Sequence, residues 1–323
     1  MALNPSTAGE LRQAFSLRTT IQLYRQSIWA TLMNRGHEAE LANARSTVIQ
    51  NPAFATTVKS RSRGSKWGEG QEITSTPITL TLDQPYEVGP INWRYEDQRQ
   101  APMVGWLEQA RQDAAAKTAI YMDDNLNSFV NATTPGESLT VGSGTTNAFT
   151  TKSGDGYPYY VGTGNQLVAQ AIKELSLHWY DAHVGDDGIS VGGMPGSLWA
   201  LMDSRVFNAL LIDMENRNLH FDTLTDSLFD NRLRANRAWR GRLYGIDIMV
   251  STVMRAGTGK NVVMYSGTNM AVALAVDPPV TQFWTPETNQ DGPNYKINMA
   301  GLFGRQLVNK DLLTKVTFAT KKS

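Results

Sequence analysis

The residues best suited to metal or acid–base chemistry are few in this sequence and poorly spaced for it. Four histidines occur among 323 residues, and cysteine is absent. His178 and His183 stand five positions apart in a segment with helical periodicity, whereas two ligands on one helix face need a spacing of three or four. The lack of cysteine excludes thiolate metal sites and disulfides. We therefore expect satisfied or exposed histidines, with no metal and no cofactor.

Three glycine-rich stretches superficially suggest nucleotide binding. Residues 257–260 read Gly-Thr-Gly-Lys, but a phosphate-binding loop also needs a glycine where Met254 stands and a Ser or Thr where Asn261 stands. The glycine pairs in 142–144 and 162–164 follow no apolar strand and lack the third glycine of a dinucleotide fingerprint. We expect these stretches to be loops.

Two acidic pairs are the remaining candidates for general acid–base work. Asp123–Asp124 and Asp186–Asp187 are adjacent in sequence, so their side chains diverge on a helix or a strand, and we expect solvated carboxylates. No Gly-x-Ser-x-Gly nucleophile elbow occurs either. We predict that the protein is not an enzyme, with a soluble α/β enzyme of unrecognised site as an alternative.

Composition fits a folded protein that associates with itself. The apolar content is 41% and the formal net charge is zero, which supports a sizeable core and favours self-association over recruitment by a global field. No apolar run approaches the roughly 20 residues of a membrane span, and the first residues do not resemble a signal peptide. We expect a cytoplasmic protein without a membrane partner.

The longest predicted element is a helix over residues 102–130. Apolar residues recur there at helical spacing, and Pro135-Gly136 ends the pattern. Such a rod is roughly 40 Å long, which exceeds what a compact domain needs to cross its core.

The chain before the rod forms an arm and a hairpin. The chain up to Lys66 is locally basic, and the apolar residues of the arm, residues 1–53, follow helical spacing until Gly36. Within 54–96 the period changes to two at Ile78, Leu80 and Leu82, with 54–58 as the expected partner strand and a glycine-rich tip between them. An isolated hairpin is marginally stable, so we expect this one to lie on a neighbouring subunit.

An α+β body follows the rod. Residues 132–164 read as loop, and Gly267 reads as a turn. The predicted helices are 167–182 and the segment after Asp203, the predicted strands are 197–202, 246–251, 262–266 and 271–276, and the tail 295–318 is extended but broken by Gly301 and Gly304. We expect the last strand to pair backwards against the rod.

This order of parts resembles the major capsid proteins of tailed bacteriophages, which have the Hong Kong 97 fold. Residues 197–211 look like the strand and helix of their axial domain, 241–252 like the glycine-spaced strand that follows, and 304–318 like the final peripheral-domain strands. The resemblance covers nearly the whole chain and depends on the combination and its order.

The resemblance implies an α+β fold of the Hong Kong 97 type in four parts. These are an N-terminal arm (1–53), an extended β-hairpin loop (54–96), a peripheral domain with a long spine helix and C-terminal strands (97–131 and 292–323), and an axial domain (132–291). It further implies a head protein that forms pentamers and hexamers of an icosahedral virion shell around double-stranded DNA, assembled in the host cytoplasm. An encapsulin-like nanocompartment shell is an alternative with the same fold.

Partners follow from the same resemblance. They are further copies of the chain, a separate scaffolding protein, a portal, packaged DNA held by non-specific contact, and optionally a decoration protein. A separate scaffolding protein is expected because the arm is too short to replace one. No lysine occurs between Lys66 and Lys117, so we expect a shell without covalent crosslinks. Candidate subunit-interface residues are Lys66, Trp67 and Glu69 at the hairpin tip and Arg232, Arg234, Arg237 and Arg240 in a basic cluster.

The basic cluster has two functional interpretations beside that of an ordinary surface loop. It forms ion pairs between subunits, or it contacts packaged DNA on the inner surface of the shell. The sequence leaves these open.

Overall fold

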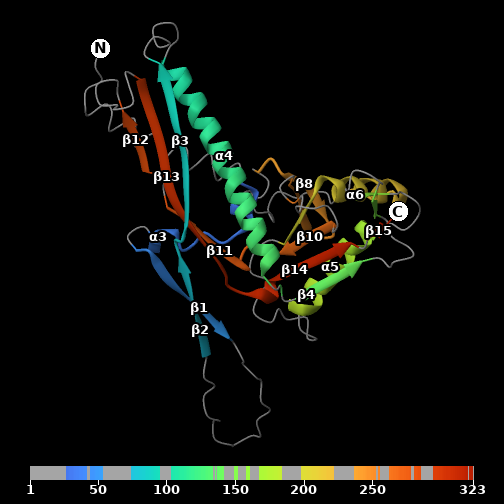
Figure 1. Ribbon diagram of the computed structural model, residues 1–323. Coiled ribbons are helices and arrows are strands. Elements are labelled where there is room, and N and C mark those ends of the chain that lie inside the picture. Colours follow the sequence, from blue (N-terminus) through green and yellow to red (C-terminus); the bar gives the residue numbers. More distant parts are fainter. Residues whose placement is uncertain are drawn as a thin grey trace, which may run out of the picture.

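The computed structural model shows an elongated α+β molecule with a slender ribbon at one end and a broader body at one side (Figure 1). The structure describes residues 27–41, 44–53, 74–94, 103–133, 135, 137–141, 149–151, 158–160, 167–183, 198–221, 236–251, 254, 262–277, 280–284, 294–318 and 320–322.

The longest helix is α4 (Met103–Ala132), which confirms the rod predicted over residues 102–130. It lies along a four-stranded sheet in Figure 1. That sheet contains β3 (Gln84–Arg94), β11 (Val272–Val276), β12 (Val280–Trp284) and β13 (Asn294–Leu307). The central strand is β13, which pairs antiparallel with all three others.

The helix and this sheet pack through aromatic and polar side chains. The Phe303 ring of β13 meets Tyr121 of α4 edge to face, with centroids 6.3 Å apart, and tilts against Tyr86 of β3. Arg305 donates from Nη1 to the Asn125 carbonyl at 3.0 Å. The strand that lies beside the rod is therefore β13, which precedes the last long strand.

The projecting ribbon is β1 (Ser46–Ala53) paired antiparallel with β2 (Thr74–Thr81). The strand that pairs with Ile78 and Leu80 is thus residues 46–53, which we expected to be arm, and not residues 54–58 as predicted. Residues 54–58 themselves lie outside the described residues. Two short helices precede the ribbon, α2 (Ile28–Leu32) and α3 (Glu38–Leu41). The helical run expected to continue to Gly36 ends at Leu32, where Met33 is extended, and Asn34 then forms a bridge to Ala273 of the four-stranded sheet.

The body is a six-stranded sheet in the order β4-β14-β10-β7-β9-β8. Its strands are β4 (Glu137–Val141), β14 (Leu313–Phe318), β10 (Val262–Gly267), β7 (Trp199–Met202), β9 (Ile246–Val250) and β8 (Trp239–Leu243), with α5 (Leu167–His183) and α6 (Ser204–Arg217) beside them. A short helix, η3 (Lys310–Leu312), precedes β14, and β15 (Thr320–Lys322), β5 (Phe149–Thr151) and β6 (Pro158–Tyr160) form a small third sheet. The predicted helices and strands of the body are confirmed to within a few residues.

Three expectations about extended segments are wrong. Residues 132–164, expected to be loop, contain β4, β5 and β6. The strand β12 follows Pro278-Pro279, where we predicted no strand. The last long strand, β14, pairs with β4 and β10 inside the six-stranded sheet and does not lie on the rod. The pairings of β4 with β14 and of β5 with β15 join residues distant in sequence, which local patterns do not reveal.

Glycines expected to break or turn the chain instead allow close packing. Strand β13 continues through Gly301 and Gly304. A Cβ at Gly304 would lie 2.1 Å from the Thr81 carbonyl oxygen, and one at Gly301 would lie 2.5 Å from the Tyr86 hydroxyl. Gly267 ends β10 rather than forming a turn, and its Cβ would lie 2.7 Å from the Leu312 carbonyl oxygen. These positions exclude side chains for reasons of space.

The main core lies on both faces of the six-stranded sheet. On one face Trp179 of α5 donates from Nε1 to Ser266 Oγ at 3.1 Å. On the other face Trp29 of α2 packs edge-on against Trp199, with ring centroids 5.9 Å apart, and tilts against Tyr265. Because neighbouring strand residues point to opposite faces, Ser266 contacts the α5 side of the sheet and Tyr265 contacts the α2 side. Residues 27–32, which we call the N-terminal segment, are thus part of the core.

Candidate functional site

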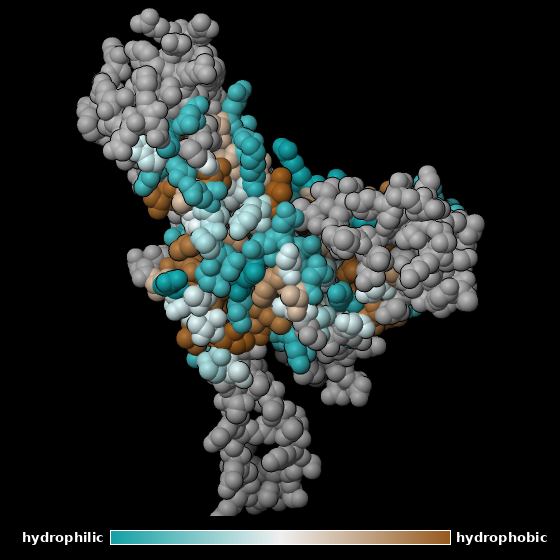
Figure 2. Space-filling view, in the orientation of Figure 1, coloured by the Kyte–Doolittle hydropathy of each residue, from teal (hydrophilic) through white to brown (hydrophobic). Residues whose placement is uncertain are grey.

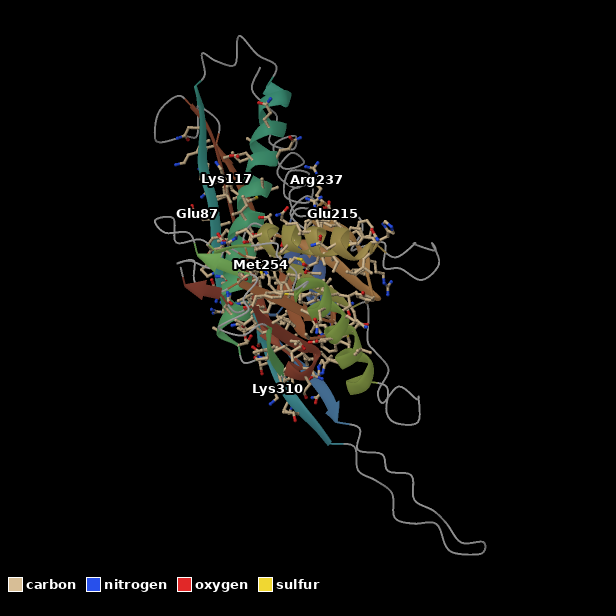
Figure 3. All side chains as sticks on the ribbon, turned by 90° about the vertical axis from the view of Figure 1, so that its right-hand side faces the viewer. Glu87, Lys117, Glu215, Arg237, Met254 and Lys310 are labelled. Carbon is tan, nitrogen blue, oxygen red and sulfur yellow. The ribbon has the colours of Figure 1, made fainter. Side chains whose placement is uncertain are left out.

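Of the seven predicted interface residues, the structure describes two. Arg237 and Arg240 are both exposed, one just before β8 and one on it. Arg232, Arg234, Lys66, Trp67 and Glu69 lie outside the described residues. Figure 3 shows Arg237 at the same edge of the body as Glu215 of α6, and Figure 1 shows β8 beside α6.

The described part of the basic cluster is held by the residue that precedes it. Asn236 is buried, and its Nδ2 donates to the Ser27 carbonyl at 3.2 Å and to Thr31 Oγ1 at 2.9 Å. Its Oδ1 accepts from the Ala238 amide at 2.9 Å. Arg237 therefore projects from an anchored turn, and the anchor is the N-terminal segment. The sequence analysis did not identify Asn236, which has no distinctive spacing.

The N-terminal segment is in turn attached to the rod by Asp123. The carboxylate Oδ1 accepts from Ser27 Oγ at 2.7 Å and from the Trp29 amide at 3.1 Å, and Oδ2 accepts from the Ile28 amide at 3.0 Å. Asp123 is only 3% exposed, so the expectation of a solvated carboxylate is wrong for it, although Asp124 is exposed. The sequence did contain a sign of this burial, since position 123 follows Ala119 by four residues and so lies on the same apolar face of the helix.

Burial has the largest effect on the pKa of the Asp123 carboxyl. It raises the Asp123 pKa to about 6, although the hydrogen bonds from Ser27, Ile28 and Trp29 oppose the rise. The nearby Asp124 charge adds a smaller upward contribution. Asp123 is therefore a buried group whose charge changes in the mildly acidic range.

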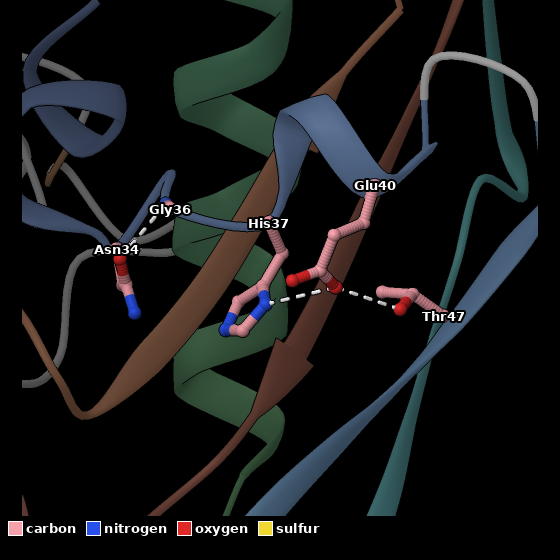
Figure 4. A network of polar contacts seen from close by, with 5 residues as sticks. All are labelled: Asn34, Gly36, His37, Glu40 and Thr47. Atoms are coloured by element: carbon pink, nitrogen blue, oxygen red, sulfur yellow. Dashed lines mark hydrogen bonds and ion pairs between the residues drawn. The ribbon is translucent and has the colours of Figure 1, made fainter.

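A second polar cluster fixes the base of the projecting ribbon (Figure 4). Glu40 of α3 accepts from Thr47 Oγ1 of β1 at 2.8 Å, and its Oε2 lies 3.3 Å from His37 Nδ1. The hydrogen bond from Thr47, followed by that from His37, lowers the Glu40 pKa. The cluster is exposed, so it orients the ribbon more than it stabilises the fold.

Several large apolar side chains remain exposed on the elongated part of the molecule. Val48 of β1 is 52% exposed, Ile120 of α4 is 55% exposed and Val280 of β12 is 66% exposed. Figure 2 shows mostly hydrophilic residues over the middle of one face and hydrophobic residues gathered below them, where the ribbon meets the sheet. Single exposed apolar side chains are normal on a protein surface and do not by themselves mark a subunit contact.

The described residues contain neither a metal-ligand cluster nor a membrane-spanning helix. Among them, no group of three or more His, Cys, Asp or Glu side chains could hold a metal ion. No helix in the described part of the chain has the length and apolar character needed to cross a membrane. Of the glycine-rich stretches considered above, residues 142–144, 162–164 and 257–260 lie outside what the structure describes.

Comparison with solved structures identifies the fold. No family model matches the sequence, and no curated protein matches it. The chain resembles the capsid of Ralstonia phage GP4 with a TM-score of 0.58 and 10% identity, covering 92% of each chain. It resembles a structure from Mycobacterium phage Che8 with a TM-score of 0.56 and 15% identity, covering 90% of this chain and 91% of that one.

A third similar structure is the capsid of the cyanophage P-SCSP1u, with a TM-score of 0.54 and 12% identity over 93% of this chain and 89% of that one. At such identities the likeness concerns the fold. The chain has the mixed α+β fold of phage capsid proteins over nearly its whole length, which confirms the fold family indicated by the order of its elements.

Proposed function

We propose that this chain is a major capsid protein that assembles with copies of itself into a closed shell. The observation that carries the proposal is the match to phage capsid structures across about nine-tenths of both chains. The shape supports it, because a projecting two-stranded ribbon gains stability from a neighbouring surface. Modest contacts repeated through a symmetric lattice give cooperative assembly.

We assign the parts of the subunit as the resemblance implies. In this assignment α4 is the spine helix of a peripheral domain and β13 lies beside it. The six-stranded sheet with α5 and α6 is the axial domain, and β1 and β2 belong to the extended loop. The pairing pattern supports a boundary near residue 132 but not one near 292, because β11 and β12 pair with β13 beside the rod. In addition, β14 returns to the axial sheet.

The finer features of the proposal concern assembly and contents. Subunits form pentamers and hexamers of an icosahedral virion shell, with a separate scaffolding protein and a portal, and a decoration protein could bind outside. The shell encloses double-stranded DNA, and its subunits contact that DNA non-specifically. Assembly takes place in the host cytoplasm.

Electron microscopy of the purified chain under assembly conditions tests the proposal. Closed particles of uniform size are expected. Small oligomers under every condition, combined with turnover of a metabolite, would instead favour an enzyme. Particles that hold protein cargo and no nuclease-protected DNA would favour the nanocompartment alternative.

Charge reversal of the basic cluster separates its two interpretations. We expect Arg234→Glu with Arg237→Glu to prevent particle formation if the cluster forms ion pairs between subunits, because a reversed charge repels its former partner. Normal empty shells with impaired DNA retention would reject this interpretation in favour of DNA contact. The charge-preserving double variant Arg234→Lys and Arg237→Lys is the matched control.

A further inference from the structure

Asp123 lies at the junction of three separate parts of the chain. It belongs to α4, and its three recorded donors come from residues 27–29 of the N-terminal segment. The segment's Ser27 carbonyl accepts a hydrogen bond from Asn236, just before Arg237. A change at this one carboxyl therefore reaches the rod, the N-terminal segment and the turn that carries Arg237.

The geometry accommodates the neutral acid. Oδ1 accepts two hydrogen bonds and Oδ2 one, so with the proton on Oδ2 the carbonyl oxygen keeps both of its donors. The hydroxyl oxygen retains a lone pair for the Ile28 amide. The ionised form accepts the same three bonds more strongly, but it places a charge in a site that is 3% exposed, and this cost of burial is the larger effect.

The charged groups around Asp123 do not compensate that charge. On α4, the adjacent Asp124 is acidic and favours the neutral form. The contacts from the N-terminal segment are a hydroxyl and two backbone amides, and the turn before β8 contributes the uncharged Asn236 through Ser27. Among the described residues, no basic side chain forms an ion pair with Asp123. Separation of the segment from α4 exposes the carboxyl to water, which stabilises the ionised form.

We propose that the contact between Asp123 and residues 27–29 is a proton-controlled latch, which holds the N-terminal segment firmly against α4 in acid and loosens as the pH rises to neutrality. The attached state binds the proton more tightly than the separated state, so by linkage a rise in pH favours separation. Opening the latch also withdraws the carbonyl that anchors Asn236 and frees the turn before β8. The latch is a property of the single chain and does not depend on shell formation.

Hydrogen–deuterium exchange of the purified full-length chain tests the latch. The opening constant of the amides in residues 28–32, corrected for the intrinsic pH dependence of exchange, is measured from pH 4 to pH 7. We expect it to rise on the order of a hundredfold over this range, the ratio that separates an ordinary aspartate from one titrating near pH 6. The amide of Ala238, which Asn236 caps, is expected to follow the same trend.

Two matched variants locate the effect. Asp123→Asn keeps the size of the side chain but cannot ionise, so its opening constant should be nearly independent of pH. Asp113→Asn removes an exposed carboxylate on the same helix, where it pairs with Lys117, and should keep the wild-type response. A wild-type opening constant that is flat or falls with pH would overturn the proposal, as would an unchanged response in Asp123→Asn. If Asp123→Asn does not fold, as judged by circular dichroism, the wild-type series decides alone.

Discussion

At the scale of single residues, the interior of this protein depends on a few residues whose neighbours come from distant segments of the chain. Asp123 and Gly304 are the clearest cases. One is a carboxyl buried beneath the N-terminal segment, and the other is a glycine pressed against the backbone of β2. Their roles follow from contacts with residues far away in sequence.

The pH dependence of global stability should carry the mark of Asp123. Its pKa is raised in the folded protein to about 6, so the stability it contributes is fully present below its ordinary value of 3.8 and is lost as the pH rises through 6. Urea unfolding of the wild type and Asp123→Asn should show a difference in unfolding free energy that changes by about 3 kcal/mol between pH 3 and pH 7. A constant difference would contradict the assignment.

A methyl group at Gly304 should be poorly tolerated. Its Cβ would lie 2.1 Å from the Thr81 carbonyl oxygen, and backbone atoms cannot move aside cheaply. We expect Gly304→Ala to lower the unfolding free energy by about 3 kcal/mol or more, measured by urea denaturation. Gly36→Ala is the control, because the nearest atom to its Cβ is the end of the Asn34 side chain at 3.2 Å. Equal losses in both variants would argue against the close approach.

At the scale of elements, α4 is buried on one side and exposed on the other along its described length. Met122, Leu126 and Val130 are fully buried, whereas Ile120 is 55% exposed. The long helix is therefore a structural member of the fold with a free outer face. This asymmetry explains why its sequence shows an apolar stripe without being apolar all round.

The two faces of α4 should respond differently to truncation. Leu126→Ala leaves a cavity in the core and should lower the unfolding free energy by about 2–5 kcal/mol. Ile120→Ala removes a side chain that is 55% exposed and should cost less than about 1 kcal/mol. Thermal or urea unfolding of unassembled protein measures both. If Ile120→Ala instead prevents particle assembly without loss of stability, the outer face of α4 is a subunit contact.

At the scale of the whole molecule, the chain closes on itself through its C-terminal strands. β13 is central to the sheet beside the rod, and β14 lies between β4 and β10 in the body. The last segment therefore connects both parts of the subunit. Neither sheet is complete until nearly the whole chain is present.

Removal of residues 313–323 should abolish cooperative folding. It takes away β14 with its buried Val316 and Phe318 and leaves β4 and β10 unpaired along one edge. Removal of residues 319–323 alone spares β14 and should leave a cooperative thermal transition by circular dichroism. A cooperative transition of wild-type height in the longer truncation would show that the six-stranded sheet does not need β14.

Local sequence patterns determined the elements, because helical and alternating spacing act over short stretches of chain. They predicted α4, α5, β9 and β10, and the order of parts that indicated the capsid fold. Only the tertiary structure decided the pairing of β4 with β14 and the anchoring of Arg237 through Asn236 and Ser27. It also decided that Asp123 is buried, because burial and close approach depend on partners that chain folding brings from far along the sequence.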